Sequence, residues 1–435
     1  TKKQVVDPVR HKQLSAQYLK IINDLEARYP VQVDASFAKL VNFKTNKQLP
    51  IHGWFDYKQG YADQLVQRLI TAADLRPGEY VLDPFTGVGT TQVSAQRMRV
   101  NSVGLDINPV ASFAASVKTH HYTPVELRII KQLLEAPADK YQLTKKTPAY
   151  KKLRDIFTQA QLQQVLTIKG FWEAIDDQSV QGFFRLAFLA IIEPVSNRVK
   201  DGNGIKIAHR KKPLEDVYAF YEAHCQRMLD DLNGQAASTP ALVLDGSLLQ
   251  DEISKQVARL PIGAVIYSPP YANCFDYLEV YKMEVWLGGF VDDYQDFSRY
   301  RQLAIRSHVN AAFSSEIKYP NPHVDTIAAL IATHNIWNKH IPAMLRGYFD
   351  DMRGVMKRTY QVSRDGALCA IVVANSGYKG VIVPTDLLLT EIAEAVGYRL
   401  EKIIHARDIR ASSQQMTELK SKHGLMRESI IVLRK

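Results

Sequence analysis

The chain has 435 residues, a formal net charge of +10 at pH 7, and 46% hydrophobic and 23% charged residues. These proportions exclude disordered, collagen-like and coiled-coil chains, and the lack of both a signal-peptide core and an apolar run of roughly 18 residues predicts a cytoplasmic protein. The three cysteines form no CxxC pair, which predicts neither a disulfide framework nor a metal site, and the length allows one large domain or about two to three smaller ones.

Helix and strand patterns alternate along most of the chain. Apolar residues at helical spacing predict helices over residues 11–30 and 61–73. Short apolar runs predict seven strands, at residues 80–83, 102–106, 241–245, 264–267, 368–373, 398–405 and 429–433. Helical patterning interrupts this alternation over residues 115–235 and again over residues 275–345. The pattern predicts an α/β fold with a doubly wound, mostly parallel sheet and a largely helical insert.

A glycine-rich turn follows the first predicted strand. That strand ends in Asp83, and Gly87 and Gly89 let the backbone turn tightly under a ligand before the next helix begins. The second strand ends in Asp106, which is placed to accept hydrogen bonds from two ribose hydroxyls. Either acid alone is more simply a helix cap or turn former. Together, next to a turn that is not GxGxxG, they favour a nucleoside cofactor without a pyrophosphate.

A second motif, Ser268-Pro269-Pro270-Tyr271, directly follows the fourth predicted strand. Two prolines fix an extended backbone and remove two N–H donors, so carbonyl acceptors face the crevice outside the strand ends, where open α/β sheets bind ligands. An isolated motif of this kind is more simply a rigid turn. Its place in the same sheet as Asp83 favours a ligand site.

Together, Asp83-Pro84-Phe85-x-Gly87-x-Gly89-Thr90-Thr91 and Ser268-Pro269-Pro270-Tyr271 resemble the motifs of the S-adenosylmethionine-dependent DNA amino-methyltransferases. The serine in the second motif is most similar to the cytosine-N4 enzymes, because adenine-N6 enzymes more often carry Asp or Asn there. The resemblance implies a class I, Rossmann-like methyltransferase fold with S-adenosylmethionine as cofactor. It implies catalytic roles for Ser268, Pro269, Pro270 and Tyr271. The implied cofactor-binding residues are Trp54, Phe55, Tyr57, Asp83, Pro84, Phe85, Thr86, Gly87, Gly89, Thr90, Thr91, Asp106, Ile107 and Asp245.

The implied reaction requires activation of the target amine, because the lone pair of a cytosine N4 amine is delocalised into the ring. We expect the Ser268 side chain and the Pro269 carbonyl to accept the amine hydrogens, so that the lone pair can attack the methyl group in line. The base must leave the duplex, and we expect Tyr271, with Phe275 or Tyr277, to stack on it. No metal is required.

The basic charge is concentrated in one window. Residues 145–212 hold 13 Lys and Arg against 6 Asp and Glu, a net charge of +7. The densest run, residues 197–206, is rich in Gly and Asn and predicts a flexible loop that presents cations to phosphates, although a solvated surface loop is the commoner case. The predicted DNA contacts are Arg198, Lys200, Lys206, Arg210, Lys211, Lys212 and Arg306. We expect this excess to line a DNA cleft that faces Ser268-Pro269-Pro270-Tyr271.

These patterns divide the chain into an N-terminal helical segment (1–50), a catalytic domain (51–115 and 236–435) and a target-recognition insert (116–235), with residues 275–345 as a candidate second one. Our first hypothesis is a monomeric, sequence-specific cytosine-N4 methyltransferase of double-stranded DNA, acting in restriction–modification or phage defence beside a cognate restriction endonuclease. The alternatives are adenine-N6 methylation, RNA guanine-N2 methylation, and a non-catalytic DNA-binding specificity subunit with a methyltransferase fold. The intact motifs argue against the last.

Overall fold

A computed structural model describes residues 8–58, 60–201, 204–234, 239–311, 316–409 and 424–435. Its centre is an eight-stranded sheet in the order β1-β11-β12-β8-β7-β2-β3-β6. The strands are β1 (Val31–Val33), β2 (Tyr80–Asp83), β3 (Asn101–Asp106), β6 (Ala241–Asp245), β7 (Ile262–Tyr267), β8 (Ser363–Ala374), β11 (Arg399–Asp408) and β12 (Arg427–Arg434). β12 is antiparallel to both neighbours, and the other pairs are parallel.

All seven predicted strands are present, and the prediction of seven was one short. The additional strand, β1, has three residues and pairs in parallel with β11 at the edge of the sheet. A run of three residues is too short to show alternation, so its extended structure depends on the neighbouring strand. The sheet is therefore α/β and mostly parallel as expected, with one more edge strand.

The strand order reverses next to β2. The chain passes outward from β2 through β3 to β6, returns to β7 on the other side of β2, and continues to β8. In open α/β sheets, ligands bind outside the carboxyl ends of the strands at such a reversal. Asp83 ends β2 and Ser268 follows β7, so both motifs lie at this point.

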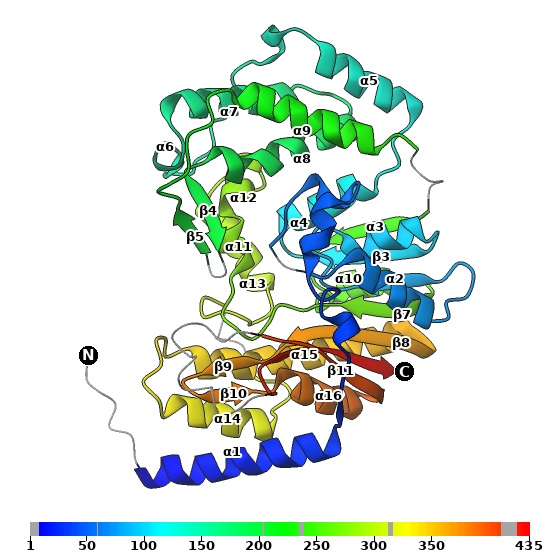
Figure 1. The fold of residues 1–435 in the computed structure, drawn as a ribbon, viewed down its shortest axis with the longest axis vertical. Helices are drawn as coiled ribbons and strands as arrows, with labels where there is room; N and C mark the ends of the chain where they lie inside the picture. Colours follow the sequence, from blue (N-terminus) through cyan, green and yellow to red (C-terminus); the bar gives the residue numbers. More distant parts are fainter. Residues whose placement is uncertain (1–7, 59, 202–203, 235–238, 312–315, 410–423) are drawn as a thin grey trace.

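Helices cover both faces of the sheet (Figure 1). The residues of β7 alternate between these faces: Val265 and Tyr267 pack in the cluster formed with α14, α15 and α16, whereas Ala264 and Ile266 pack in the cluster with α2. The helices that cover the sheet are α2 (Asp63–Ala72), α3 (Thr90–Arg97), α10 (Asp251–Val257), α14 (Pro322–Ala332), α15 (Ile341–Val362) and α16 (Thr385–Val396). A further helix, α1 (Pro8–Arg28), packs on α14 and α16. The short segments η1 (Ala35–Phe37), η2 (Phe43–Gln48), η3 (His52–Trp54), β9 (Ser376–Tyr378) and β10 (Val381–Val383) connect them.

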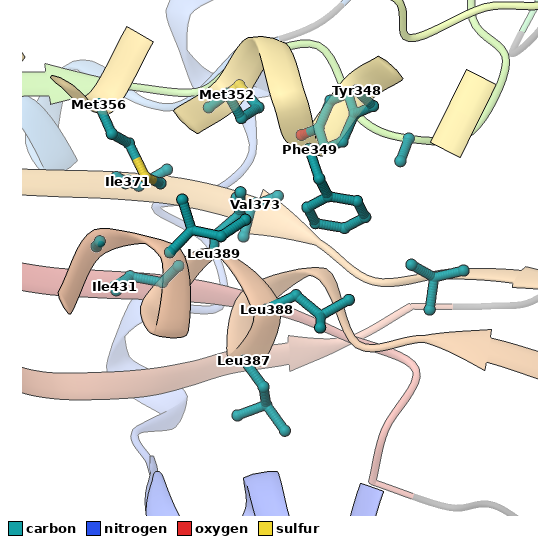
Figure 2. Close-up of a cluster of buried hydrophobic side chains, with 14 of the residues drawn as sticks. Tyr348, Phe349, Met352, Met356, Ile371, Val373, Leu387, Leu388, Leu389 and Ile431 are labelled. Carbon is teal, nitrogen blue, oxygen red and sulfur yellow. The ribbon is translucent and has the colours of Figure 1, made fainter. Parts of the chain in front are cut away.

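The larger of the two sheet-facing clusters lies between α15, α16 and the sheet. Figure 2 shows part of it, with Met352 and Met356 of α15 pointing toward Ile371 and Val373 of β8. Burial of such side chains contributes about 1.5–3 kcal/mol each. This packing holds β7 and β8 in register and so positions the loop that follows β7.

A second body, mostly helical, lies above the sheet in Figure 1. It comprises α5 (Pro124–Glu135), η4 (Ala138–Lys140), α6 (Leu153–Ile156), α7 (Gln159–Glu173), α8 (Gln178–Val195) and α9 (Val217–Asp231). α4 (Pro109–Thr119) lies between this body and the sheet, because it contacts β3 and β6 as well as α8. α8 is buried on most sides, as expected of a central helix, with Phe183, Phe184 and Phe188 fully covered. None of the helices in the described part of the chain combines the length and hydropathy that a bilayer crossing requires.

The predicted flexible loop over residues 197–206 is instead a β-hairpin. β4 (Arg198–Asp201) pairs antiparallel with β5 (Gly204–Ile207), while residues 202 and 203 lie outside the described residues. The prediction of a loop was therefore wrong over the two strands.

The segment 275–345 does not form one separate insert. Its first part, α11 (Tyr277–Val280), α12 (Lys282–Gly288) and α13 (Tyr294–Leu303), packs in the same cluster as the helical insert, through residues such as Tyr281 and Trp286. Its second part, from Ile305 through α14, packs in the cluster on the sheet. The segment therefore crosses from the helical body back to the central sheet.

Candidate active site

A cavity open to solvent lies at the carboxyl ends of β2, β3, β6 and β7. One wall comes from the loops after these strands, and includes residues 83–88, Asp106, Gly246 and Ser268. A further part of the lining comes from residues 276–278, 303–305, 307 and 308, which we call the far wall. The cavity therefore joins both sequence motifs in one space.

Asp83 holds the glycine-rich turn in place. Its Oδ2 accepts hydrogen bonds from the hydroxyls of Tyr61, at 2.9 Å, and Thr91, and its Oδ1 accepts one from the Phe85 N–H at 3.0 Å. Burial raises the pKa of Asp83 to about 6, against these hydrogen bonds, which lower it. Gly87 and Gly89 follow with φ of 51° and 84°, the left-handed region that glycine adopts without strain.

Asp106 connects the ends of β2 and β3. Its Oδ2 accepts the Gly87 N–H at 2.9 Å and its Oδ1 accepts the Asn108 N–H at 2.8 Å. The side chain also lines the cavity, and each carboxylate oxygen keeps a further lone pair for a ligand hydroxyl. Burial raises the pKa of Asp106 to about 6.

Ser268 begins a chain of hydrogen bonds that leads away from the cavity. Its hydroxyl lies 3.4 Å from the Tyr271 hydroxyl, which donates to Oε1 of Glu428 at 2.7 Å. Arg407 donates from Nε to Oε2 of the same carboxylate at 2.6 Å. This chain directs the Ser268 proton toward Tyr271, which leaves the serine lone pairs to accept hydrogen bonds from the cavity.

Stacked aromatic rings connect the far wall to the insert. Tyr57 lies between Tyr277 and Tyr281, with ring centroids 6.2 Å and 4.7 Å away. Tyr57 and Tyr277 line the cavity, while the Lys200 ammonium lies 4.4 Å from the Tyr281 ring and forms a buried ion pair with Glu284. The hairpin is thus packed through two rings onto the cavity wall.

The structure brings most of the predicted cofactor and catalytic residues to the cavity. Those that line it are Tyr57, Asp83, Pro84, Phe85, Thr86, Gly87, Thr90, Asp106, Ile107, Ser268 and Pro270. The others are outside its lining: Trp54, Phe55, Gly89, Thr91, Asp245, Pro269 and Tyr271.

The residues outside the lining have structural contacts. The Trp54 indole is fully buried and donates to Asp231 at 2.9 Å, and Phe55 lies against Tyr281. Gly89 begins α3 so close to α4 that an added Cβ would lie 2.9 Å from that of Ala115. Asp245 is exposed, and the residues after it, Gly246 and Ser247, line the cavity instead.

Sequence reasoning missed most of the far wall. Leu278, residues 303–305, Ser307 and His308 line the cavity, as does Asp276. Tyr61 and Asn108 were also missed. Tyr61 and Asn108 lie next to recognised motifs, which is a usable signal, whereas residues 303–308 belong to an irregular segment without a periodic pattern.

Three predicted DNA contacts have buried or internal partners, and this corrects the prediction. Lys200 forms its ion pair with Glu284 at 2% side-chain exposure. Arg306 binds Asp350 and Asp351, each at 2.6 Å, at 8% exposure. Lys211 donates to the backbone carbonyls of Glu193 and Arg198, and burial lowers its pKa. Side chains in such pairs cannot bind phosphate without leaving a buried carboxylate or carbonyl unpaired.

The remaining predicted cations form a basic surface. Lys206, Arg210 and Lys212 are exposed, and Arg198 is half-buried. The strand β5 that carries Lys206 packs against α11, the helix that supplies Tyr277 to the cavity. The hairpin therefore lies on the side of the molecule that holds the cavity.

Comparisons with known proteins match this chain to methyltransferases. The model of a family of N6- and N4-specific methyltransferases, described as DNA methylase, matches residues 16–115. The chain is 27% identical to the Type II methyltransferase M.BsoBI of Geobacillus stearothermophilus, over 98% of this chain and 94% of that protein. It is 26% identical to the Type II methyltransferase M.AvaI of Nostoc sp. (strain PCC 7120), over 91% and 89%.

Among solved structures, the rRNA methyltransferase aviRa of Streptomyces viridochromogenes aligns with 9% identity and a TM-score of 0.30, over 86% of this chain and 85% of that one. This superposition is too weak to support a fold assignment, which depends on the strand order. The family match includes Asp83 and Asp106 but ends before Ser268, and the similarity to M.BsoBI extends over nearly the whole of both chains. Together, the family match and the similarity to the two Type II methyltransferases support a DNA amino-methyltransferase family for this chain.

Proposed function

We propose that this protein transfers a methyl group from S-adenosylmethionine to the N4 amine of a flipped cytosine in double-stranded DNA. The observation that carries this proposal is the single cavity lined by Asp106, at the end of β3, and by Ser268 and Pro270, after β7. A nucleoside site and a set of amine acceptors in one space are what a methyl transfer between two bound partners requires.

The described residues fit the cofactor. Asp106 offers carboxylate lone pairs to ribose hydroxyls, and its backbone partners hold both oxygens in place. Gly246 and Ser247 line the cavity at the end of β6, on the side proposed for adenine. Tyr57 and Phe85 line the part proposed for the methionine group. When bound, the cofactor supplies a methyl group on a positively charged sulfur.

Ser268 performs the proposed work on the target amine. With its proton directed to Tyr271, its oxygen accepts one N–H of the amine and favours a nitrogen whose lone pair leaves the ring plane. The predicted role of the Pro269 carbonyl is similar. We place Tyr271 behind Ser268, as the residue that orients it, because its hydroxyl is bound to Glu428.

The serine hydroxyl supports cytosine-N4 over adenine-N6, in line with the resemblance of its motif. The test is mass spectrometry of nucleosides from DNA of several compositions, incubated with the protein and isotopically labelled S-adenosylmethionine. We expect labelled N4-methylcytosine. Labelled N6-methyladenine would show that the target base is adenine and not cytosine. Labelled N2-methylguanine that appears only with RNA substrates would show that the substrate is RNA and not DNA.

The proposed partners follow from the same assignment. Exposed Lys206, Arg210 and Lys212 suit DNA phosphates. Similarity to Type II methyltransferases over most of the chain supports a role in restriction–modification, with a cognate endonuclease recognising the same site. We propose action as a monomer in the cytoplasm, where that DNA is found.

A further inference from the structure

A histidine on the far wall faces the same cavity as Ser268. His308 is 4% exposed and lines the cavity beside Asp276. The backbone near it is tied to the catalytic loop, because the Cys274 N–H donates to the Ser307 carbonyl at 3.1 Å. His308 therefore has a fixed position relative to the chain segment that starts at Ser268.

One ring nitrogen of this histidine lacks a hydrogen bond within the described part of the chain. Its Nδ1 is buried without a hydrogen-bond partner among the residues that the structure describes. The closest carboxylate oxygen, Oδ2 of Asp276, is 3.8 Å away, and that side chain caps α11 through its Oδ1. Buried polar groups are rarely left in this state, and catalytic hydrogen bonds are often long before substrate binds.

Resting on the proposed function, we propose that His308, oriented by Asp276, accepts the proton that the exocyclic amine loses when it is methylated. As the nitrogen forms its bond to the methyl carbon, the carbon–sulfur bond breaks and its electron pair stays on sulfur. The nitrogen then carries a positive charge and an excess proton. That proton passes to Nε2 of neutral His308, and the resulting imidazolium later releases it to water.

The charges around His308 are consistent with a neutral resting state. Burial lowers its pKa, with a smaller lowering from Arg301, and Asp276 opposes both. Arg301 itself is paired with Asp276 at 3.1 Å and with Glu279 at 2.9 Å. A carboxylate at Nδ1 stabilises the imidazolium that forms, as in other histidine–carboxylate pairs.

The first test is the single-turnover methylation rate of His308→Gln between pH 5 and 9, with cofactor and DNA saturating. The wild-type rate should fall at low pH as His308 is protonated. The variant should be about 100-fold slower, in the range of general-base effects, and should lose this acidic limb. Cofactor and DNA affinities should stay within about threefold, since Asp106 and the basic surface are unchanged. The control is His323→Gln, which changes a half-buried histidine of α14 paired with Glu391 of α16, and it should match the wild type.

A second readout needs no turnover. In protein with 13C-labelled histidine, NMR titration of His308 should give a pKa that Asp276→Asn lowers, because the carboxylate no longer favours the imidazolium. His308→Asn replaces His308→Gln if the latter melts at a lower temperature.

An unchanged rate or a retained acidic limb in both His308 variants overturns the inference, as does an unshifted pKa in Asp276→Asn. A wild-type protein that methylates no base overturns the proposed function, which separates the two failures.

Discussion

The two walls of the cavity are stabilised by different means. The strand-end wall consists of loops that follow neighbouring parallel strands, and backbone hydrogen bonds such as that from Gly87 to Asp106 connect one loop to the next. The far wall consists of the start of α11 and the irregular segment after α13, and stacked tyrosines and the buried pair of Lys200 and Glu284 connect it to the insert. The sheet therefore preforms the cofactor side of the cavity, whereas the far wall depends on packing between distant parts of the chain.

From this difference between the walls, we expect the largest effect when a contact that supports the far wall is removed. Lys200→Met leaves Glu284, at 1% side-chain exposure, as an unpaired buried carboxylate. We expect a loss of about 3–5 kcal/mol in unfolding free energy, measured by urea denaturation. The double variant Lys200→Met/Glu284→Leu should recover most of it, because it removes both charges.

Lys206→Met is the matched control for this experiment. It lies on the same hairpin, with 72% of its side chain exposed in an ion pair with Asp201, so its effect should stay below about 1 kcal/mol. Equal losses for Lys200→Met and Lys206→Met would show that the hairpin does not support the wall.

On the strand-end wall, the largest expected effect is on cofactor binding. Asp106→Ala should weaken S-adenosylmethionine binding, measured by calorimetry, by about 100-fold or more, because hydrogen bonds to a charged group contribute about 1.5–3 kcal/mol each. Asp245→Ala is the control: it pairs in register with Asp106 but is exposed outside the cavity lining. Asp245→Ala should weaken cofactor binding by less than about threefold. A loss of affinity as large as that of Asp106→Ala would indicate that Asp245 does contact the cofactor.

The same difference between walls explains what the sequence could predict. The seven strands were recognisable as short apolar runs between turns, and Asp83, Asp106 and Ser268 were recognisable because each follows such a run. The far wall gave no such signal, since Asp276 and His308 belong to irregular segments brought together only by the tertiary fold.

Lys200 and Arg306 were wrongly predicted as DNA contacts for a related reason. A lysine or arginine in a basic segment has the same local pattern whether it is exposed or buried. The partner of Lys200 is 84 positions away, and that of Arg306 is 44 positions away at Asp350. Burial of these side chains is decided by packing that periodicity does not encode.

The exposed cations should affect DNA binding and little else. Lys206→Ala/Arg210→Ala/Lys212→Ala should weaken binding by about 10-fold at moderate salt and reduce the slope of log affinity against log salt by about 0.9 for each phosphate that the variant no longer neutralises. Cofactor affinity and stability should be unchanged. The control triple, Lys255→Ala/Arg399→Ala/Lys402→Ala, removes exposed cations from α10 and β11. Equal weakening by both triples would mean that the effect is one of net charge and not of the hairpin.

The smallest expected effect concerns the orientation of Ser268 on the strand-end wall. Tyr271→Phe removes only the hydroxyl between Ser268 and Glu428, and we expect a single-turnover rate about fivefold lower with unchanged cofactor affinity, because one hydrogen bond contributes about 1 kcal/mol.

Tyr29 provides a matched control for this variant, because its hydroxyl also donates to a carboxylate, Glu394 at 2.8 Å, that is paired with an arginine, Arg28. Tyr29→Phe should cost similar stability and leave the rate intact. If Tyr271→Phe also leaves the rate intact, then Ser268 needs no partner to orient it, and the strand-end wall holds its catalytic group through backbone geometry alone, as it holds Gly87 and Gly89.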